Sequence, residues 1–366
     1  HGTAHPAPDA THFSGQIGKH ILKWESHTEF VTYTVFLDDL GVRAFDPEDF
    51  NGFPADWLGE APGVRISSML IRVEHQIDDG DISAKLDQWF VPESLAVSAV
   101  LDGAALIASD FRIDMAGHTR MAVFARPDTG VRRIGRVVQR ATEIEYYKTM
   151  SMLGLARVRT LSAPLGALDG QLTSLISGLT GTDAEAEDTL TALLSISAEL
   201  ETHVTQAAFR FGATGAYEAL VNQRIEILRE TRFQGRQTLA EFMMRRFDPA
   251  MRTVKATQAR LNQMADRAKR AGDLLRTRVD VERSAQNQKL LTSMDARAAL
   301  QLRLQTTVEG LSVVAISYYA VNLATYLTYP LAASLGTSKT LLTSILTLPV
   351  VAIVFWMVHR IRHKIE

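Results

Sequence analysis

The sequence predicts an α+β cytoplasmic domain followed by a helical bundle, a very long stalk helix and a two-helix transmembrane hairpin. Three observations support this fold class: strand-like alternation in roughly the first 130 residues, apolar residues at helical spacing beyond them, and two uncharged apolar runs near the C-terminal end. The 366 residues exceed one ordinary domain. We expect five parts, with boundaries at 1–134, 135–247, 248–310, 311–358 and 359–366.

The N-terminal domain is expected to hold a small mixed sheet with helices. Alternating β-branched and aromatic residues favour strands at Phe30–Phe36, Arg65–Val73, Leu95–Leu101, Ala105–Ile113 and Thr119–Ala125. A capped helix is expected between strands, at Asp81–Phe90. The chain has no glycine-rich phosphate loop and no nucleophile elbow, so we expect it not to be an enzyme.

The middle of the chain is expected to form a helical bundle against the base of the long helix. The expected helices are Arg136–Leu153, Asp183–Phe211, Ala213–Thr231 and Arg236–Phe247. Pro164 and the Gly178–Gly181 region are expected to interrupt this helical part, with further breaks near Gly212 and Gly235.

One very long helix is expected to begin at Asp248. Asp248 is a good N-cap, and Pro249 sits at the first helical position, where its missing N–H costs nothing. No further proline occurs before Pro330. At ~1.5 Å per residue, these roughly 80 residues would span on the order of 120 Å. Gly272 and Gly310 weaken the helix without ending it.

Two uncharged runs, Leu311–Leu331 and Leu341–Val358, have the length and composition of membrane spans. Basic residues flank both outer ends of the pair, whereas the turn between the runs carries Lys339 alone. By the positive-inside rule, we expect a multi-pass protein of the bacterial inner membrane with both termini in the cytoplasm. The alternative is a buried core hairpin of a soluble protein. The flanking basic residues are Arg297, Arg303 and the cluster His359–Lys364.

Polar and aromatic side chains follow one stripe of the first predicted span. Polar groups are costly in hydrocarbon unless they face one another or water, so such a stripe should face a symmetry axis. The stripe either lines a narrow pore or joins neighbouring helices by hydrogen bonds. Val308 and Ala315 also lie on it. The expected pore-lining residues are Gln301, Gln305, Ser312, Tyr319, Asn322, Tyr326 and Tyr329.

Asp78, Asp79 and Asp81 concentrate carboxylates around a glycine turn, as a divalent cation would require. The ordinary alternative is a turn with a helix cap. No other cofactor is expected. Two further sets could form a metal or acid–base site if each shares one face of a strand, although ion pairs on a sheet are the ordinary reading. These sets are Glu25, His27 and Glu29, and Asp110, Arg112 and Asp114. The N-terminal histidines fit no helical metal pair, and are His1, His5, His12, His20 and His27.

Charge is segregated along the chain: the first hundred residues are acidic and the long helix is basic, with a net charge of −2. The basic helix lacks interleaved aromatic residues and leads into an apolar run. We therefore expect no nucleic-acid partner. The absence of cysteine excludes disulfides and thiolate metal sites, and suits a cytoplasmic body.

Several segments closely resemble a bacterial family of uncharacterised membrane-anchored proteins, described as a domain of unknown function. The resemblance covers most of the chain and supplies no activity. The segments that carry it are Trp24–Phe30, Ser109–Asp114, Gly135–Tyr146, Arg210–Gln223, Arg245–Arg252 and Gln301–Tyr319.

The order of the parts is also similar to that of CorA-type divalent-cation channels, which are homopentamers with the first span around the pore. The Gly-Met-Asn signature of those channels is absent, because the end of the first run reads from Tyr329 to Gly336 without it. The similarity rests on architecture alone.

The expected function is a homo-oligomeric channel or transporter for ions in the inner membrane, with membrane lipid and further copies of the chain, five by the CorA comparison, as partners. The alternative is a non-conducting membrane-anchored scaffold whose axis the same tyrosines seal. A weaker third hypothesis is an enzyme that uses His27, Glu29, Asp110 and Arg112.

Overall fold

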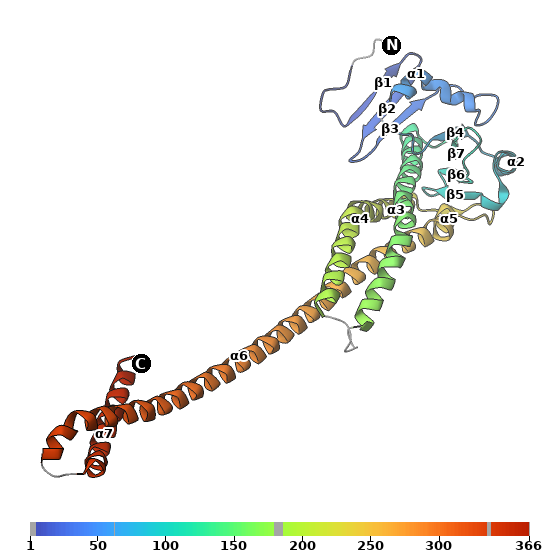
Figure 1. Ribbon diagram of the computed structural model, residues 1–366. Helices are drawn as coiled ribbons and strands as arrows, with labels where there is room; N and C mark the ends of the chain where they lie inside the picture. Colours follow the sequence, from blue (N-terminus) through green and yellow to red (C-terminus); the bar gives the residue numbers. More distant parts are fainter. Residues whose placement is uncertain (1–4, 62, 179–185, 335–337, 366) are drawn as a thin grey trace. The chain divides into compact units, whose positions relative to one another are not determined.

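The computed structural model describes residues 5–61, 63–178, 186–334 and 338–365. It shows a mixed α+β chain with two sheets, one very long helix and an apolar C-terminal helix (Figure 1). The chain divides into two compact units, His1–Asp273 and Leu274–Glu366, which we call unit 1 and unit 2.

Unit 1 begins with an antiparallel three-stranded sheet in the order β1-β2-β3. Its strands are β1 (His12–Ile17), β2 (His20–Ser26) and β3 (Val31–Phe36). The expected strand at Phe30–Phe36 is therefore confirmed as β3, whereas β1 lies in a histidine-bearing stretch for which we expected no strand. A short 3-10 helix (Pro47–Gly52) and helix α1 (Ala55–Glu60) follow.

The second sheet has five strands in the order β4-β7-β6-β5-β8. β4 and β7 are parallel and the other neighbours are antiparallel, so the expected mixed sheet is confirmed. The last strand, β8, begins at Thr231, which we had predicted to end the helix Ala213–Thr231. Thr231 instead pairs with Ala99 of β5. The strands are β4 (Met69–His75), β5 (Ala96–Val100), β6 (Ala105–Ser109), β7 (Thr119–Ala125) and β8 (Thr231–Arg232).

Both faces of the five-stranded sheet are buried. On one face, helix α2 (Asp79–Trp89) packs Ile82 and Leu86 against the sheet residues Leu106 and Phe124. On the other face lie helix residues such as Ile144. The remaining helices of unit 1 are a 3-10 helix (Pro92–Ser94), α3 (Val131–Gly178), α4 (Ala186–Leu228) and α5 (Leu239–Arg246).

Helices α3 and α4 lie side by side and cross closely where Gly154 of α3 meets Thr214 of α4 (Figure 1). The expected interruption at Pro164 is wrong, because α3 continues through this residue. A proline inside a helix costs about 3 kcal/mol, but Leu161 and Leu165 on either side are buried and hold the segment in place. The expected break at Gly212 is also wrong: α4 is continuous there, next to buried Phe211.

The end of α3 at Gly178 agrees with the expected interruption, while residues 179–185 lie outside the described residues. Helix α5 begins with a capping box in which the Thr238 hydroxyl accepts from the Glu241 N–H and the Glu241 carboxylate accepts from the Thr238 N–H. Helix α6 then runs from Asp248 to Ser334 as one helix of 87 residues, so the predicted long helix is confirmed. Helix α7 is Lys339–Ile365.

Candidate functional site

The polar stripe predicted on the first apolar run lies on α6 within unit 2. Its members are exposed, except for Asn322, which is half-buried, and Tyr319 and Tyr326 leave about two thirds of their surface uncovered, 68% and 66%. Most of the stripe is therefore left uncovered by the other described residues of unit 2.

A different face of the same segment is buried. Ser317, Val321 and Thr325 follow one another at four-residue steps, and all three are buried, as is Val354 of α7. Unit 2 holds only the end of α6 and α7 among its described elements, so we infer that the two helices pack through these faces. At the start of α7, the Lys339 ammonium also lies over the Tyr326 ring, 5.2 Å from its centroid.

The stripe and the buried face lie on opposite sides of α6. At about 100° per residue, the stripe is centred roughly 150° from the line through Ser317, Val321 and Thr325. Helix α7 thus covers the face that lacks the stripe. Most of the stripe therefore remains available to another molecule.

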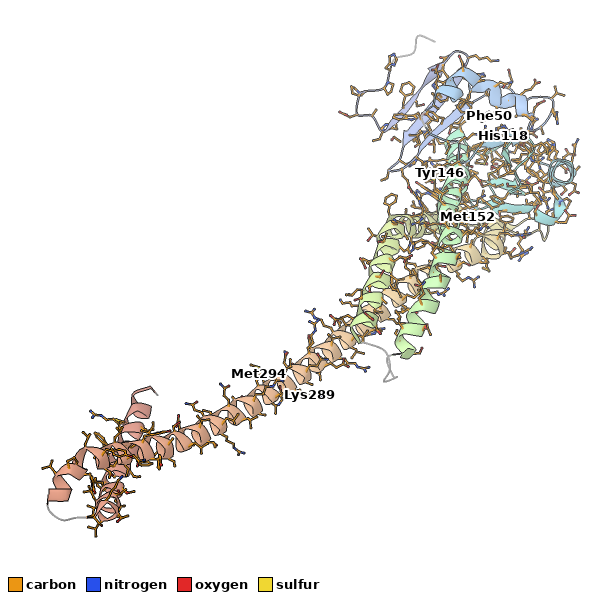
Figure 2. All side chains as sticks on the ribbon, viewed as in Figure 1. Phe50, His118, Tyr146, Met152, Lys289 and Met294 are labelled. Atoms are coloured by element: carbon orange, nitrogen blue, oxygen red, sulfur yellow. The ribbon has the colours of Figure 1, made fainter. Side chains whose placement is uncertain are left out.

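The stripe extends further toward the N-terminus than we predicted. Steps of four and three residues alternate without a break from Asn287 to Tyr329, which is the 3.5-residue repeat of a helical seam. Residues 280–308 are all exposed, and Figure 2 shows Lys289 and Met294 projecting from this stretch. The members that we missed are Asn287, Leu291, Met294 and Ala298.

Hydrogen bonds within α6 satisfy some of the polar groups on the stripe. The Ser312 hydroxyl donates to the Val308 carbonyl at 2.8 Å, and the Asn322 amide donates to the Tyr318 carbonyl at 3.0 Å. Within the described residues, no hydrogen bond reaches the Asn322 Oδ1 or the Tyr319 hydroxyl. These groups are free to bind water, an ion or a neighbouring copy.

The three carboxylates of the predicted cation site have other partners in unit 1. Asp78 is the N-cap of α2 and accepts from the Asp81 N–H at 2.8 Å. Asp79 pairs with Arg126 at 2.7 Å, and Asp81 accepts from Gln76 at 3.2 Å. No group of three or more histidine or acidic side chains that could hold a metal ion occurs among the described residues. Asp78 therefore caps a helix, and Asp79 forms an ion pair with an arginine side chain.

Glu25, His27 and Glu29 do not share a strand face, as we had expected. β2 ends at Ser26, and the His27 N–H donates to the Phe30 carbonyl in the turn to β3. Glu29 accepts two hydrogen bonds from the Arg210 guanidinium of α4, at 3.2 and 2.7 Å.

The environment of this turn is aromatic. The His27 ring stacks on Phe30, and Tyr146 of α3 lies 5.4 Å from the His27 ring between centroids. Burial lowers the pKa of His27, and the nearby carboxylates of Glu25 and Glu143 offset only part of this effect. The first sheet thus packs on α3 through His27 and on α4 through Phe30, whose ring lies 6.0 Å from that of Tyr217.

Asp110, Arg112 and Asp114 also fail to form one strand face, because β6 ends at Ser109. Asp110 is buried and pairs with Arg120 at 3.0 Å, while Arg112 donates to the Ser94 hydroxyl at 2.8 Å. Asp114 instead closes a turn by accepting from the backbone of His118. The three residues thus tie different loops to the sheet.

The profile of one protein family matches residues 1–365 of this chain. The chain belongs to the family described as "Protein of unknown function (DUF3422)". No curated protein and no solved structure matches it. The expected resemblance to a domain of unknown function is therefore confirmed, while nothing in these comparisons links the family member to CorA-type channels. Both α6 and α7 contain a stretch long and apolar enough to span a membrane.

Proposed function

We propose that this chain is an inner-membrane protein that assembles from several copies and conducts ions along a central axis lined by the α6 stripe. The observation that carries the proposal is the position of this stripe, which lies on the side of α6 opposite the face that α7 covers. In a symmetric assembly, α7 would face lipid and the stripe would face its own copies. Five copies is the number that the CorA-like order of parts favours.

The exposure of the apolar side chains in unit 2 supports a location in a membrane. Only 17% of the residues in the apolar stretch of α6 and 6% of those in α7 are buried in the structure. A core helix of a soluble protein would be mostly buried, whereas here large side chains such as Leu323, Phe355 and Trp356 are exposed. Hydrocarbon would cover them, and the basic flanks would hold both termini in the cytoplasm.

Several side chains of the stripe are polar or small, which suits a water-filled ion path better than a tightly packed interface between helices. The Asn322 side chain is uncharged and has an oxygen that could replace water around a cation. Gln301 and Gln305 would continue the polar lining toward the cytoplasmic side, and Gln305 is held by a hydrogen bond to Glu309 at 3.1 Å. Small Ser312 would leave room for hydrated ions.

Ion flux into liposomes tests this proposal. Asn322→Leu removes the amide and keeps the branching and the number of side-chain heavy atoms. We expect it to abolish the flux of the wild-type protein while the size of the assembly stays unchanged. Ser317→Ala is the matched control, because it removes a hydroxyl on the buried face of α6, about 140° around the helix from Asn322. We expect this control to conduct. Equal loss in both variants would contradict the proposal.

A second candidate function is a non-conducting membrane scaffold. It is favoured by Tyr319, Tyr326 and Tyr329, whose large rings all lie on the stripe and could fill the axis of a narrow bundle. In that case, the wild-type assembly would form but would carry no ion at any ionic composition. Asn322→Leu would then alter only the stability of the assembly.

A further inference from the structure

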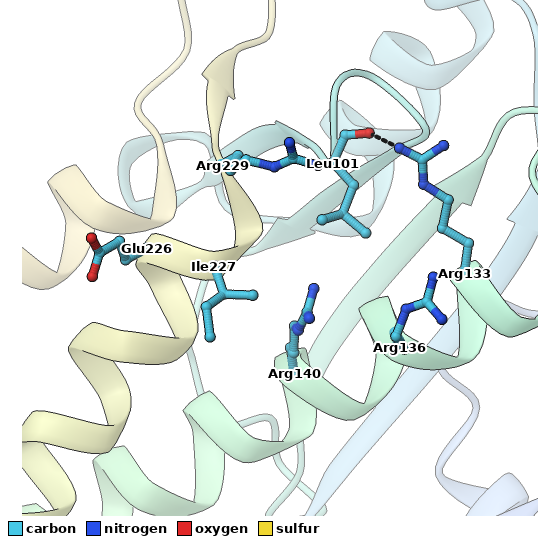
Figure 3. Close-up of a pocket in the computed structure, with 7 residues that line it drawn as sticks. All are labelled: Leu101, Arg133, Arg136, Arg140, Glu226, Ile227 and Arg229. Atoms are coloured by element: carbon cyan, nitrogen blue, oxygen red, sulfur yellow. Dashed lines mark hydrogen bonds between the residues drawn. The ribbon is translucent and has the colours of Figure 1, made fainter.

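An open pocket rich in arginine lies in unit 1, apart from the α6 stripe. It is formed by the start of α3, the end of α4 and the turn between β5 and β6 (Figure 3). Its volume is about 760 Å³, within the range of small-molecule sites. The pocket is lined by Leu101, Arg133, Arg136, Arg140, Glu226, Ile227 and Arg229.

The start of α3 carries its cations where they do not stabilise the helix. Arg133, Arg136 and Arg140 are three and four residues apart and so share one face. The first turn of α3 holds no acidic residue, although the N-terminal end of a helix has a partial positive charge that favours anions. This effect is confined to the first turn, where a cation such as Arg133 costs on the order of 0.3–1 kcal/mol. A bound anion would reverse this cost.

Two acidic groups close to the pocket, Asp102 and Glu143, are already paired. Asp102 accepts from Arg229 at 2.8 Å and lies 3.8 Å from the Arg133 guanidinium. Arg133 also donates to the Leu101 carbonyl at 2.5 Å, which Figure 3 draws as a dashed line. Glu143 of α3 is bound by Arg224. These contacts hold the rim of the pocket without neutralising its interior.

Arg136 and Arg140 have no ion pair or hydrogen bond with any described side chain. In Figure 3 their guanidinium groups lie on the pocket side of α3, whereas the Glu226 carboxylate points away from them. The pKa of Arg140 lies below its ordinary value because of burial and the positive charges of Arg136, Arg224 and Arg229, which outweigh the attraction of Glu143. The pocket therefore has an unbalanced positive charge.

The turn opposite these arginines is held in a costly conformation. Leu101 and Asp102 have φ angles of 50° and 60°, in the left-handed region that a bulky residue such as leucine rarely adopts. Such residues cost on the order of 1–3 kcal/mol each. The conformation directs the Leu101 carbonyl and the Asp102 carboxylate onto Arg133 and Arg229. The turn thus positions two arginines and leaves the other two for a ligand.

We propose that this pocket binds a small molecule through a phosphate group, with Arg136 and Arg140 as its direct ligands and Arg133 and Arg229 positioned around it. Guanidinium groups present paired donors that match phosphate oxygens, and they stay charged at physiological pH. The site is independent of the proposed conduction, because it is built entirely from unit 1. The phosphate could belong to a soluble compound or to a lipid headgroup.

Titration calorimetry with inorganic pyrophosphate tests the site on the full chain in a neutral detergent at constant ionic strength. We expect saturable binding to the wild-type protein and, because hydrogen bonds to charged groups contribute about 1.5–3 kcal/mol, at least about tenfold weaker binding to Arg136→Gln and to Arg140→Gln. Arg136 is exposed, so its variant should fold. Arg132→Gln is the matched control, since Arg132 is an exposed cation in the first turn that does not line the pocket.

A second titration with a short-chain phosphatidylglycerol separates the two sources of phosphate. Binding of the lipid alone, lost in Arg136→Gln, would assign the site to a headgroup, and binding of pyrophosphate, lost in the same variant, would assign it to a soluble compound. Either result supports the proposal. Binding of neither probe, or equal weakening in Arg132→Gln, would overturn it, whatever the flux assay shows.

Discussion

Unit 1 and unit 2 satisfy their side chains in opposite ways. All of the largest fully buried side chains, from Ile82 to Leu228, belong to unit 1. In unit 2 the large apolar side chains are exposed over most of α6 and α7. The buried ones among the described residues are few, namely Leu275 and Val279 near its start, and Ser317, Val321, Thr325 and Val354 in the apolar runs. Unit 1 therefore forms its own core, whereas unit 2 leaves most of its large apolar side chains uncovered.

The same contrast holds for polar groups. In unit 1 the buried charges have partners: Glu74 binds both Arg72 and Lys85, and Asp110 binds Arg120. On the α6 stripe, the polar groups either bond to their own helix or have no described partner. Since an unpaired polar group in hydrocarbon costs several kcal/mol, the missing partners should be water or further copies of α6.

Among the substitutions that test the core of unit 1, we expect the largest change in unfolding free energy at Gly154. An added Cβ would lie 2.9 Å from Thr214 Cγ2 and closer still to its hydroxyl, so Gly154→Ala should separate α3 from α4. We expect unit 1 to lose about 1–3 kcal/mol of unfolding free energy, as overpacked sites do. Urea unfolding followed by tryptophan fluorescence measures this change.

Gly166→Ala provides the matched control in the same helix. A Cβ at Gly166 would meet nothing within 4 Å, so this change should stabilise α3 by about 0.5–1 kcal/mol through helix propensity. If Gly154→Ala and Gly166→Ala shifted the unfolding free energy in the same direction, the close packing of α3 on α4 would be refuted.

A smaller, pH-dependent effect is expected at Glu29. Burial raises the pKa of Glu29, but the hydrogen bonds from Arg210 and Tyr217 and the Arg210 charge outweigh burial, so the pKa lies below 4.5. Such a carboxylate stabilises the fold at pH values above the pKa that the glutamate has in the unfolded chain. This stabilisation is lost as the pH falls through the lower pKa of the folded state. Glu29→Gln should therefore cost about 1–2 kcal/mol at neutral pH.

The difference between Glu29→Gln and the wild type should shrink when urea unfolding is repeated at pH values between 6 and 3. Glu25→Gln is a suitable comparison, because Glu25 pairs with Lys23 on the first sheet, where both side chains are about one-third exposed. A gap for Glu29→Gln that stayed constant across this pH range would exclude the Arg210 pair as its cause.

Much of the fold could be predicted from the sequence, because strong local signals agreed with the tertiary structure. The Asp248-Pro249 start and the long stretch without proline predicted α6, and alternation predicted most strands of the five-stranded sheet. The errors occurred where packing overrode local preference. Pro164 and Gly212 lie inside helices because α3 and α4 bury leucine and phenylalanine beside them.

The candidate sites were only partly accessible to the same reasoning. Periodicity located the α6 stripe, but the face opposite it could be assigned only when burial showed where α7 packs. The Arg133, Arg136 and Arg140 spacing was visible in the sequence, yet the pocket also needs Arg229, which the fold brings from the end of α4. The acidic turn at Asp78 was misleading because a helix cap and a cation site use the same residues.

Disulfide cross-linking in the membrane tests the central claim most directly. The chain has no cysteine, so Asn322→Cys and Val321→Cys each introduce a single thiol. These neighbouring positions are about 100° apart around α6, one on the stripe and one on the buried face. If the stripe faces its own copies, mild oxidation should join subunits through Asn322→Cys and leave Val321→Cys monomeric on a denaturing gel. Cross-linking of Val321→Cys instead, or of neither variant, would contradict the proposed axis.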